Sequence, residues 1–209
     1  MPPAAQGDAL DAVVRKIGEL AEAGVDWIQI REKDLHGGTA ARLVRESLKR
    51  VASGRSTTQI LINDRLDVAL AEGAGGVHLG ENSLAVEQAR LLIERGVPEP
   101  GSARKFLAGA SAHSLAGATT RTTAGADYIF FGPVFSTPSK AAFGEPQGLE
   151  RLAEVCNAVK VPVLAIGGIS LDNADACLRA GAAGIAAIRL FQDAENPAGV
   201  VRRLRERTA

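Results

Sequence analysis

The chain has 209 residues, 46% of them hydrophobic, and its 24 basic and 24 acidic side chains give it no net charge. This length is enough to bury one core and too short for two full-sized domains, so we expect a single domain over residues 1–209. Nucleic-acid-binding proteins carry a basic field, a membrane span needs roughly 20 apolar residues in a row, and a secreted chain begins with a signal peptide; the sequence shows none of these features.

The expected elements alternate between amphipathic helices and short apolar strands along the whole chain. The segments with helical periodicity are 8–23, 38–52, 83–95, 114–124, 146–159, 171–180 and 196–207. The apolar runs that fit buried strands are 27–30, 59–63, 76–79, 106–110, 128–131, 161–166 and 184–188. Several of these strands follow a glycine that ends the preceding helix, as Gly24 and Gly125 do, because glycine enters the left-handed conformation without a Cβ clash.

Strict alternation of helix and strand is typical of an α/β fold with a parallel sheet. Seven evenly spaced units favour a TIM (β/α)8-type barrel over an open doubly wound sheet, which usually has about five or six strands. The count is one strand short, and residues 1–8 hold two prolines and a glycine, which a central strand does not tolerate. We therefore expect seven parallel strands in a barrel that lacks its first strand. The strands at 27–30 and 184–188 are expected to flank a gap or to be covered by the proline-rich N-terminus.

The two cysteines, Cys156 and Cys177, fall in segments expected to be helical. Two thiols without CxxC spacing indicate small buried side chains in a reducing compartment, so we expect a cytoplasmic protein without disulfide bonds. The composition predicts neither a nucleic-acid partner nor a membrane partner, and apolar helix faces are compatible with a homo-oligomer.

Long cationic and polar side chains follow the predicted strands, at the end of a parallel barrel where active sites lie. Strand alternation puts Gln29, Arg31 and Lys33 on one face after the first predicted strand. Lys140 and Arg189 follow two later strands. The end of the barrel at which the strands finish, which we call the mouth, is therefore expected to be cationic although the chain is neutral. Such a local field favours a negatively charged substrate.

Two glycines, Gly167 and Gly168, follow the strand at 161–166 and leave backbone N–H groups exposed. In barrels of this type, such a turn and a short helix after the last strand form a phosphate site, although the same pair is also an ordinary turn. The cationic mouth points the same way, and phosphate is the expected ligand.

The sequence does not decide the roles of three further polar residues. Asp64 is either a metal ligand, or a helix cap or partner of an arginine. His113, two residues beyond Ser111, is either a proton-transfer group or a hydrogen-bonded loop histidine. His78 lies in mid-strand, where a structural role is favoured.

Six phrases occur in an order that resembles a known family. They cover about residues 20–190 and lie at 29–33, 62–69, 76–80, 111–114, 132–140 and 166–169. The ordered set resembles thiamine phosphate synthase and its sister, thiazole tautomerase, which implies an enzyme of thiamine biosynthesis on a TIM barrel. The synthase is a transferase that joins a hydroxymethylpyrimidine diphosphate to a thiazole phosphate and releases diphosphate.

The resemblance to the synthase implies roles for the residues of the mouth. The side chains implied to hold the diphosphate are those of Gln29, Arg31, Lys33 and Asn63. Lys140 would close over it, and Asp64 would hold its Mg²⁺. Ser111 would lie near the reacting pyrimidine. The residues implied to contact the thiazole or its phosphate are Thr137, Ser139, Gly168, Ile188 and Arg189.

The sequence also departs from the synthase pattern. Ser83 stands where the synthase has a second Mg²⁺-binding aspartate, although serine is a poor ligand for a hard cation, and Arg189 replaces a phosphate-binding serine. The stretch 143–149 resembles the tautomerase, in which a proton moves on a thiazole carboxylate phosphate without metal and His113 would be the acid/base. Because the chain keeps Gln29 and Lys33 of the synthase, we expect the synthase activity. The alternatives are the tautomerase and a non-catalytic regulator that binds thiazole phosphate.

Overall fold

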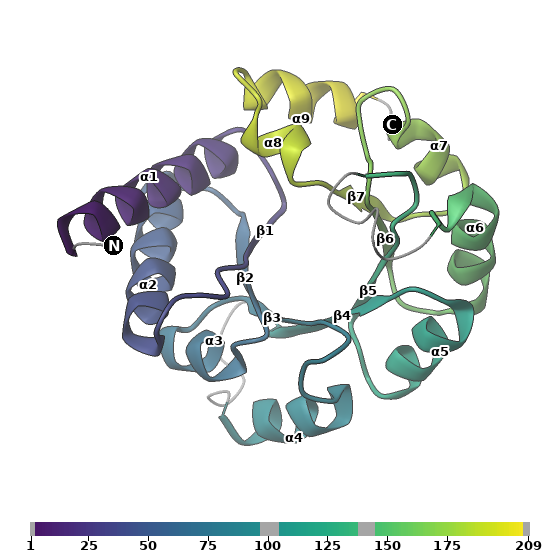
Figure 1. Cartoon of the computed structure of the whole chain (residues 1–209), viewed down its shortest axis with the longest axis horizontal. Helices are drawn as coiled ribbons and strands as arrows, with labels where there is room; N and C mark the ends of the chain where they lie inside the picture. Colours follow the sequence, from purple (N-terminus) through teal and green to yellow (C-terminus); the bar gives the residue numbers. More distant parts are fainter. Residues whose placement is uncertain (1–2, 97–104, 138–144, 207–209) are drawn as a thin grey trace.

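The computed structural model of the chain describes residues 3–96, 105–137 and 145–206. It contains one seven-stranded sheet in which the strands follow one another in chain order (Figure 1). The strands are β1 (Trp27–Ile30), β2 (Gln59–Asn63), β3 (Gly76–Leu79), β4 (Leu107–Ala112), β5 (Tyr128–Phe131), β6 (Val163–Ile166) and β7 (Gly184–Ala186). Every neighbouring pair is parallel. The predicted seven parallel strands are confirmed.

Helices cover the outside of the sheet, which curves into a ring (Figure 1). They are α1 (Pro3–Glu22), α2 (Gly37–Ser53), α3 (Leu66–Glu72), α4 (Val86–Gly96), α5 (Leu115–Thr123), α6 (Gly148–Ala158), α7 (Ala174–Arg179), α8 (Arg189–Gln192) and α9 (Pro197–Arg205). Parallel strands need such crossovers, and the arrangement is that of a TIM-type barrel. In the part of the chain that is described, no helix combines the length and the apolar character needed to cross a membrane.

The ring is open between β1 and β7, the end strands of the described sheet (Figure 1). On the outside, α1 contacts α9 across this opening. Lys16 Nζ donates a hydrogen bond to the carbonyl of Ala194 (3.3 Å), and Arg205 Nη2 donates to Asp26 Oδ1 (2.8 Å). The gap expected between the first and last predicted strands is therefore present.

Helix α1 and helix α3 differ most from expectation. Helix α1 begins at Pro3 rather than at residue 8, because proline is tolerated in the first turn of a helix, where no backbone N–H is needed. Helix α3 was not predicted. It buries Leu66, Val68 and Ala69 and ends at Gly73, which has a φ of 68°. A helix of about two turns is too short to show its periodicity in the sequence.

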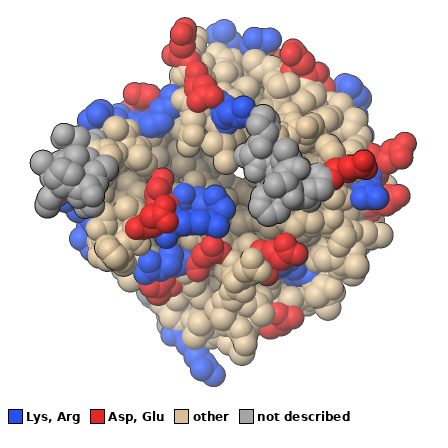
Figure 2. All heavy atoms as spheres, viewed as in Figure 1, with Lys and Arg blue, Asp and Glu red and all other residues tan. Residues whose placement is uncertain are grey.

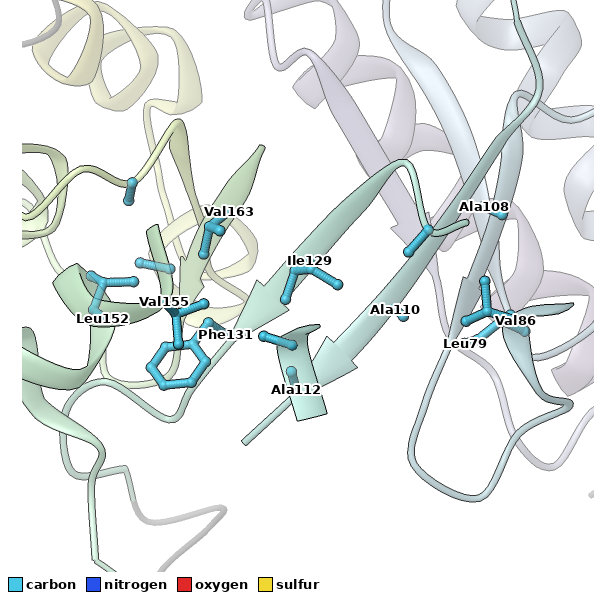
Figure 3. Packing of buried hydrophobic residues seen from close by; sticks show 14 of the residues in the cluster. Leu79, Val86, Ala108, Ala110, Ala112, Ile129, Phe131, Leu152, Val155 and Val163 are labelled. Atoms are coloured by element: carbon cyan, nitrogen blue, oxygen red, sulfur yellow. The ribbon is translucent and has the colours of Figure 1, made fainter. Parts of the chain in front are cut away.

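The main hydrophobic core lies between the outer face of the sheet and the helices (Figure 3). Phe131 of β5 and Val163 of β6 pack with Leu152 and Val155 of α6, and all four side chains are buried. Alanines such as Ala110 line β4 on the same face. Small side chains there let helices approach the sheet closely, which agrees with a chain that is poor in aromatic residues.

The inner face of the sheet carries a separate, smaller cluster formed by Leu61, Tyr128 and Phe130. The Tyr128 ring packs against Trp27, with ring centroids 4.8 Å apart. Gly109 leaves the space that this ring occupies, because a Cβ at that position would overlap it. The cluster fills the inside of the ring, as in other packed barrels.

Candidate functional site

A hydrogen-bonded chain of polar side chains crosses the carboxyl ends of β1 and β2. Gln29 Nε2 donates to Asn63 Oδ1 at 2.7 Å, and Asn63 Nδ2 donates to Asp64 Oδ2 at 2.6 Å. Gln29 lies opposite Leu61, two residues before Asn63, so the two amides share one face of the sheet. The structure thus brings together three residues that were predicted to bind a diphosphate and its metal.

Asp64 is held in a constrained position. Its backbone φ is 62°, which is uncommon outside glycine. Its Oδ1 accepts a hydrogen bond from the Ser83 hydroxyl, and the Gly80 N–H donates to Ser83 Oγ at 2.6 Å. Both carboxylate oxygens of Asp64 therefore face a donor, and Ser83 lies in the same group of residues.

The carboxylate of Asp64 suits a magnesium ion that is shared with a substrate. Within the described residues, no group of three or more His, Cys, Asp or Glu side chains could hold a metal. Mg²⁺ is commonly bound by one or two carboxylates together with substrate phosphate oxygens, rather than by a cage made wholly of protein. Each oxygen of an ionised carboxylate has a second lone pair for such a ligand. Asp64, with the neutral oxygen of Ser83 beside it, fits a site in which the substrate phosphate supplies the other ligands.

Cationic side chains lie beside the central hollow of the ring, together with acidic ones (Figure 2). Arg31 and Lys33 directly follow β1, and both are exposed. An exposed cation at a hollowed surface attracts anions and raises their local concentration. These two predicted diphosphate-binding residues therefore lie on the same strand end as Gln29.

His78 of β3 is the centre of a polar group inside the ring. Only 2% of it is exposed. Its Nδ1 lies 3.1 Å from the Tyr128 hydroxyl, and its Nε2 lies 2.9 Å from the hydroxyl of Ser111. Its ring packs on Phe130, with centroids 4.4 Å apart. Burial lowers the pKa of His78 to about 4, so the imidazole is neutral at pH 7.

The sequence favoured a structural role for His78 and gave no role to Tyr128. The structure shows that both belong to the group that holds Ser111. The signal that could have found them is the register: Gly109 of β4 lies opposite His78 on one side and opposite Tyr128 on the other. Because glycine has no side chain, the two neighbours meet across it.

The free energy of unfolding is expected to fall as the pH is lowered from about 6.5 to about 4, because of His78. Its pKa is about 6.5 in an unfolded chain and about 4 in the folded protein, so the unfolded state takes up the proton first. The stabilising contribution is complete above the unfolded pKa and is lost as the pH falls through the folded one. His78→Gln, which does not titrate, should show a shallower decline in urea unfolding over this range, whereas equal slopes would contradict the assignment.

A second group of predicted residues lies at the ends of β5, β6 and β7. Arg189, the first residue of α8, donates from Nη2 to Thr137 Oγ1 at 3.4 Å, and Thr137 is buried. Gly168 has a φ of 67°, and a Cβ there would lie 2.7 Å from both Phe135 Cβ and the Ser136 carbonyl oxygen. The loop after β5 therefore packs directly on the Gly168 turn. Three residues predicted for the thiazole and its phosphate are thus grouped together.

Asn173, which was not among the predicted residues, also belongs to this group. Asn173 Nδ2 donates to the Gly168 carbonyl at 2.9 Å and fixes the turn after β6. Ile188, directly before α8, is 60% exposed. Ser139 and Lys140 lie outside the described residues, and their roles stay predictions.

The structure separates His113 from Ser111, although only one residue lies between them. Ser111 faces the inside of the ring with His78. His113 follows the end of β4, and its Nδ1 is hydrogen-bonded to the Gly132 carbonyl. Its ring lines a pocket of about 170 Å³ that also involves Leu115 at the start of α5 and residues of α6.

Comparisons with known proteins agree with this geometry. The family described as thiamine monophosphate synthase matches residues 4–191. A relative from Geobacter sulfurreducens is 47% identical over 184 residues, which are 88% of this chain and 80% of the relative. A thiamine-phosphate synthase from Anaeromyxobacter dehalogenans is 40% identical over 181 residues, which are 87% of this chain and 76% of the relative. The solved structure of thiamine phosphate pyrophosphorylase from Pyrococcus furiosus is 32% identical, has a TM-score of 0.79, and the match covers 93% of this chain and 88% of that chain.

The family match begins in α1 and ends beyond Arg189, so it spans both groups of residues at the mouth. The relatives cover most of the chain, and the relatives named as synthases are transferases. The resemblance noted in six short phrases of the sequence is therefore confirmed over nearly the whole chain. The protein belongs to the thiamine monophosphate synthase family.

Proposed function

We propose that this chain joins a hydroxymethylpyrimidine diphosphate to a thiazole phosphate, forming thiamine phosphate and releasing diphosphate. One observation carries the proposal: the mouth holds two separate polar groups. Asp64 with Asn63 and Gln29 forms one at β1 and β2, and Arg189 with Thr137 forms the other beyond β5 and β7. Two anionic substrates that must meet need two such places.

In the proposed reaction, the bond between the pyrimidine methylene carbon and the diphosphate oxygen breaks, and its electron pair leaves with the diphosphate. The lone pair of the thiazole nitrogen then forms the new carbon–nitrogen bond. Gln29, Asn63 and Arg31 bind the diphosphate and fix the direction in which it leaves the methylene carbon. Asp64 would hold the Mg²⁺, which when bound supplies positive charge that stabilises the departing diphosphate.

The inside of the ring suits a pyrimidine that becomes electron-poor. The Ser111 hydroxyl lies inside the ring, where it is held 2.9 Å from Nε2 of the buried His78. Because His78 is neutral at pH 7, the site has no imidazolium that would repel positive charge developing on the pyrimidine. We assign Ser111 to the pyrimidine on this ground.

The second polar group binds the nucleophile. Arg189 carries a permanent positive charge that suits a phosphate. The Gly168 turn packs on the loop after β5, at the two residues before Thr137. Thr137 links this group to the loop after β5. Holding the thiazole phosphate here limits the directions from which its nitrogen can approach the methylene carbon, which turns a bimolecular step into an effectively intramolecular one.

The purified protein with both substrates and Mg²⁺ is expected to form thiamine phosphate and an equal amount of diphosphate. EDTA should lower the rate by about 100-fold or more, and excess Mg²⁺ should restore it. Thiochrome fluorescence measures the first product, and a phosphate-release assay with pyrophosphatase measures the second.

The same assay separates the alternatives. No thiamine phosphate from the Mg²⁺-loaded protein would overturn the proposed synthase activity. Isomerisation of a thiazole carboxylate phosphate in EDTA would instead identify a tautomerase. Calorimetric binding of thiazole phosphate without turnover of either substrate would identify a regulator built on the same barrel.

A further inference from the structure

We infer that His113 is a positioning residue that holds the start of the β5–α6 loop in place, rather than a proton-transfer group. The inference rests on the proposed function only in so far as Thr137, in this loop, contacts the thiazole substrate. The observation behind it is the hydrogen bond between His113 Nδ1 and the carbonyl of Gly132, the first residue after β5. A carbonyl oxygen only accepts, so Nδ1 carries the hydrogen.

The end of β4 and the residue after it bind Gly132 through both its N–H group and its carbonyl. The Gly132 N–H donates to the Ala112 carbonyl at 3.4 Å, and His113 binds the Gly132 carbonyl. Gly132 also packs so tightly on β6 that a Cβ there would overlap the Ile166 carbonyl oxygen. The position of Gly132 is therefore set from β4 by His113 and from β6 by Ile166.

The loop continues from this fixed point along β6 toward the thiazole group of the site. The Val134 N–H donates to the Ile166 carbonyl at 2.9 Å, and the Phe135 N–H donates to the Gly167 carbonyl at 3.0 Å. Thr137 follows two residues later and meets Arg189. In the described part of the chain, loss of the His113 bond would leave only the 3.4 Å bond from the Gly132 N–H to the Ala112 carbonyl between β4 and Gly132, so the start of the loop would be held more weakly against β6.

His113 is among the residues that line a pocket on the side of the barrel that α5 and α6 cover. The imidazole lines the pocket formed with the first residues of α5 and α6, among them Leu115, Gln147 and Arg151. Ser111, by contrast, meets His78 on the inner face. With Nδ1 bound to a carbonyl and the ring on the helix side, His113 acts through the loop.

Three substitutions of His113 test the inference. His113→Asn keeps an N–H donor close to the position of Nδ1, His113→Gln moves the donor toward the position of Nε2, and His113→Ala removes it. The amides of Val134 and Phe135 should exchange with solvent about tenfold faster in the alanine and glutamine variants, and within about threefold of the wild-type rate in the asparagine variant. Should the alanine variant not fold, the asparagine and glutamine variants alone carry the comparison.

Steady-state kinetics provide the second readout. The KM for thiazole phosphate should rise about tenfold in His113→Ala, while the KM for the pyrimidine diphosphate stays within twofold. His113→Asn should restore the KM and keep the wild-type pH profile, whereas a proton-transfer role predicts that asparagine is as inactive as alanine and that one limb of the profile disappears.

Ser114→Ala is the matched control. Ser114 caps α5 by accepting a hydrogen bond from the Gly117 N–H at 3.1 Å, and it does not bind Gly132. Its removal should lower the melting temperature and leave exchange at Val134 and the KM values unchanged. Unchanged exchange in His113→Ala would overturn the positioning role, whereas a wild-type protein that forms no thiamine phosphate would overturn the proposed function and leave the exchange test valid.

Discussion

Replacing Asp64 with asparagine is expected to lower kcat/KM for thiamine phosphate formation by about 100- to 1000-fold, the range seen when a group that stabilises transition-state charge is removed. Asparagine keeps the size of the side chain but removes the negative charge that would hold Mg²⁺ beside the diphosphate. It also turns an amide N–H₂ toward one of two existing donors, Asn63 Nδ2 or Ser83 Oγ. Steady-state rates over a range of Mg²⁺ concentrations measure the loss.

Two substitutions at Ser83 serve as controls for Asp64. Ser83→Ala removes one hydrogen bond to the carboxylate and should lower the rate by about tenfold at most. Ser83→Asp adds a carboxylate beside Asp64 and should lower the Mg²⁺ concentration needed for half-maximal activity. Calorimetry of diphosphate binding with and without Mg²⁺ gives a readout that does not depend on turnover. If Asp64→Asn leaves that binding and its Mg²⁺ dependence unchanged, Asp64 is not the metal ligand.

Replacing Gly109 with alanine is expected to lower the free energy of unfolding by about 3 kcal/mol, the upper part of the usual range for overpacking a core. Gly109 is the register partner of both His78 and Tyr128. An added Cβ would overlap the Tyr128 ring, which Trp27 holds from another side. Because Tyr128 binds His78, which binds Ser111, the rate of thiamine phosphate formation should fall as well. Urea unfolding and steady-state kinetics measure the two effects.

The control for Gly109 is a glycine with open space around it. A Cβ at Gly38, in α2, meets nothing within 4 Å. Gly38→Ala should raise the stability by up to about 1 kcal/mol, because alanine favours a helix over glycine. A double variant, Gly109→Ala with Tyr128→Leu, should be less destabilised than the sum of the two single changes, since the smaller side chain relieves the overlap. Equal stability of Gly109→Ala and the wild type would refute the packing argument.

The strands could be predicted from the sequence because a parallel sheet with helices on one side and a filled interior on the other has strands that are apolar on both faces. The run Tyr128–Phe131 is such a case, and all of its residues are buried. Glycines that end helices fixed where these runs begin. The same reasoning missed α3, since a short helix with Leu66, Val68 and Ala69 buried shows no full period.

The site could be predicted only in part. Strand ends in a parallel barrel meet at one rim, so the grouping of Gln29 with Asn63 follows from the fold. The direction of a side chain beyond a strand end does not, and His113 turns toward the helices although alternation would put it on the face of Ser111. His78 meets Tyr128 across Gly109 of the neighbouring strand, and it meets Ser111 of that same strand. These contacts could not be predicted because they depend on the pairing of residues that are far apart in the chain.

The opening between β1 and β7 separates two parts of the candidate site, because these two strands are not hydrogen-bonded to each other in the described sheet. Among the described strands, β1 is hydrogen-bonded to β2 alone and β7 to β6 alone, so the ladder connects Gln29 with the end of β7 only by way of the whole sheet. Gln29 lies in β1, on one side of the opening, and Arg189 follows β7, on the other side. Across the opening, α1 contacts α9, and Arg205 of α9 binds Asp26, which lies directly before β1. These contacts therefore help to set the distance between the two polar groups of the site. Exposed ion pairs are weak, so these side-chain bonds add little to the coupling between the two sides of the opening.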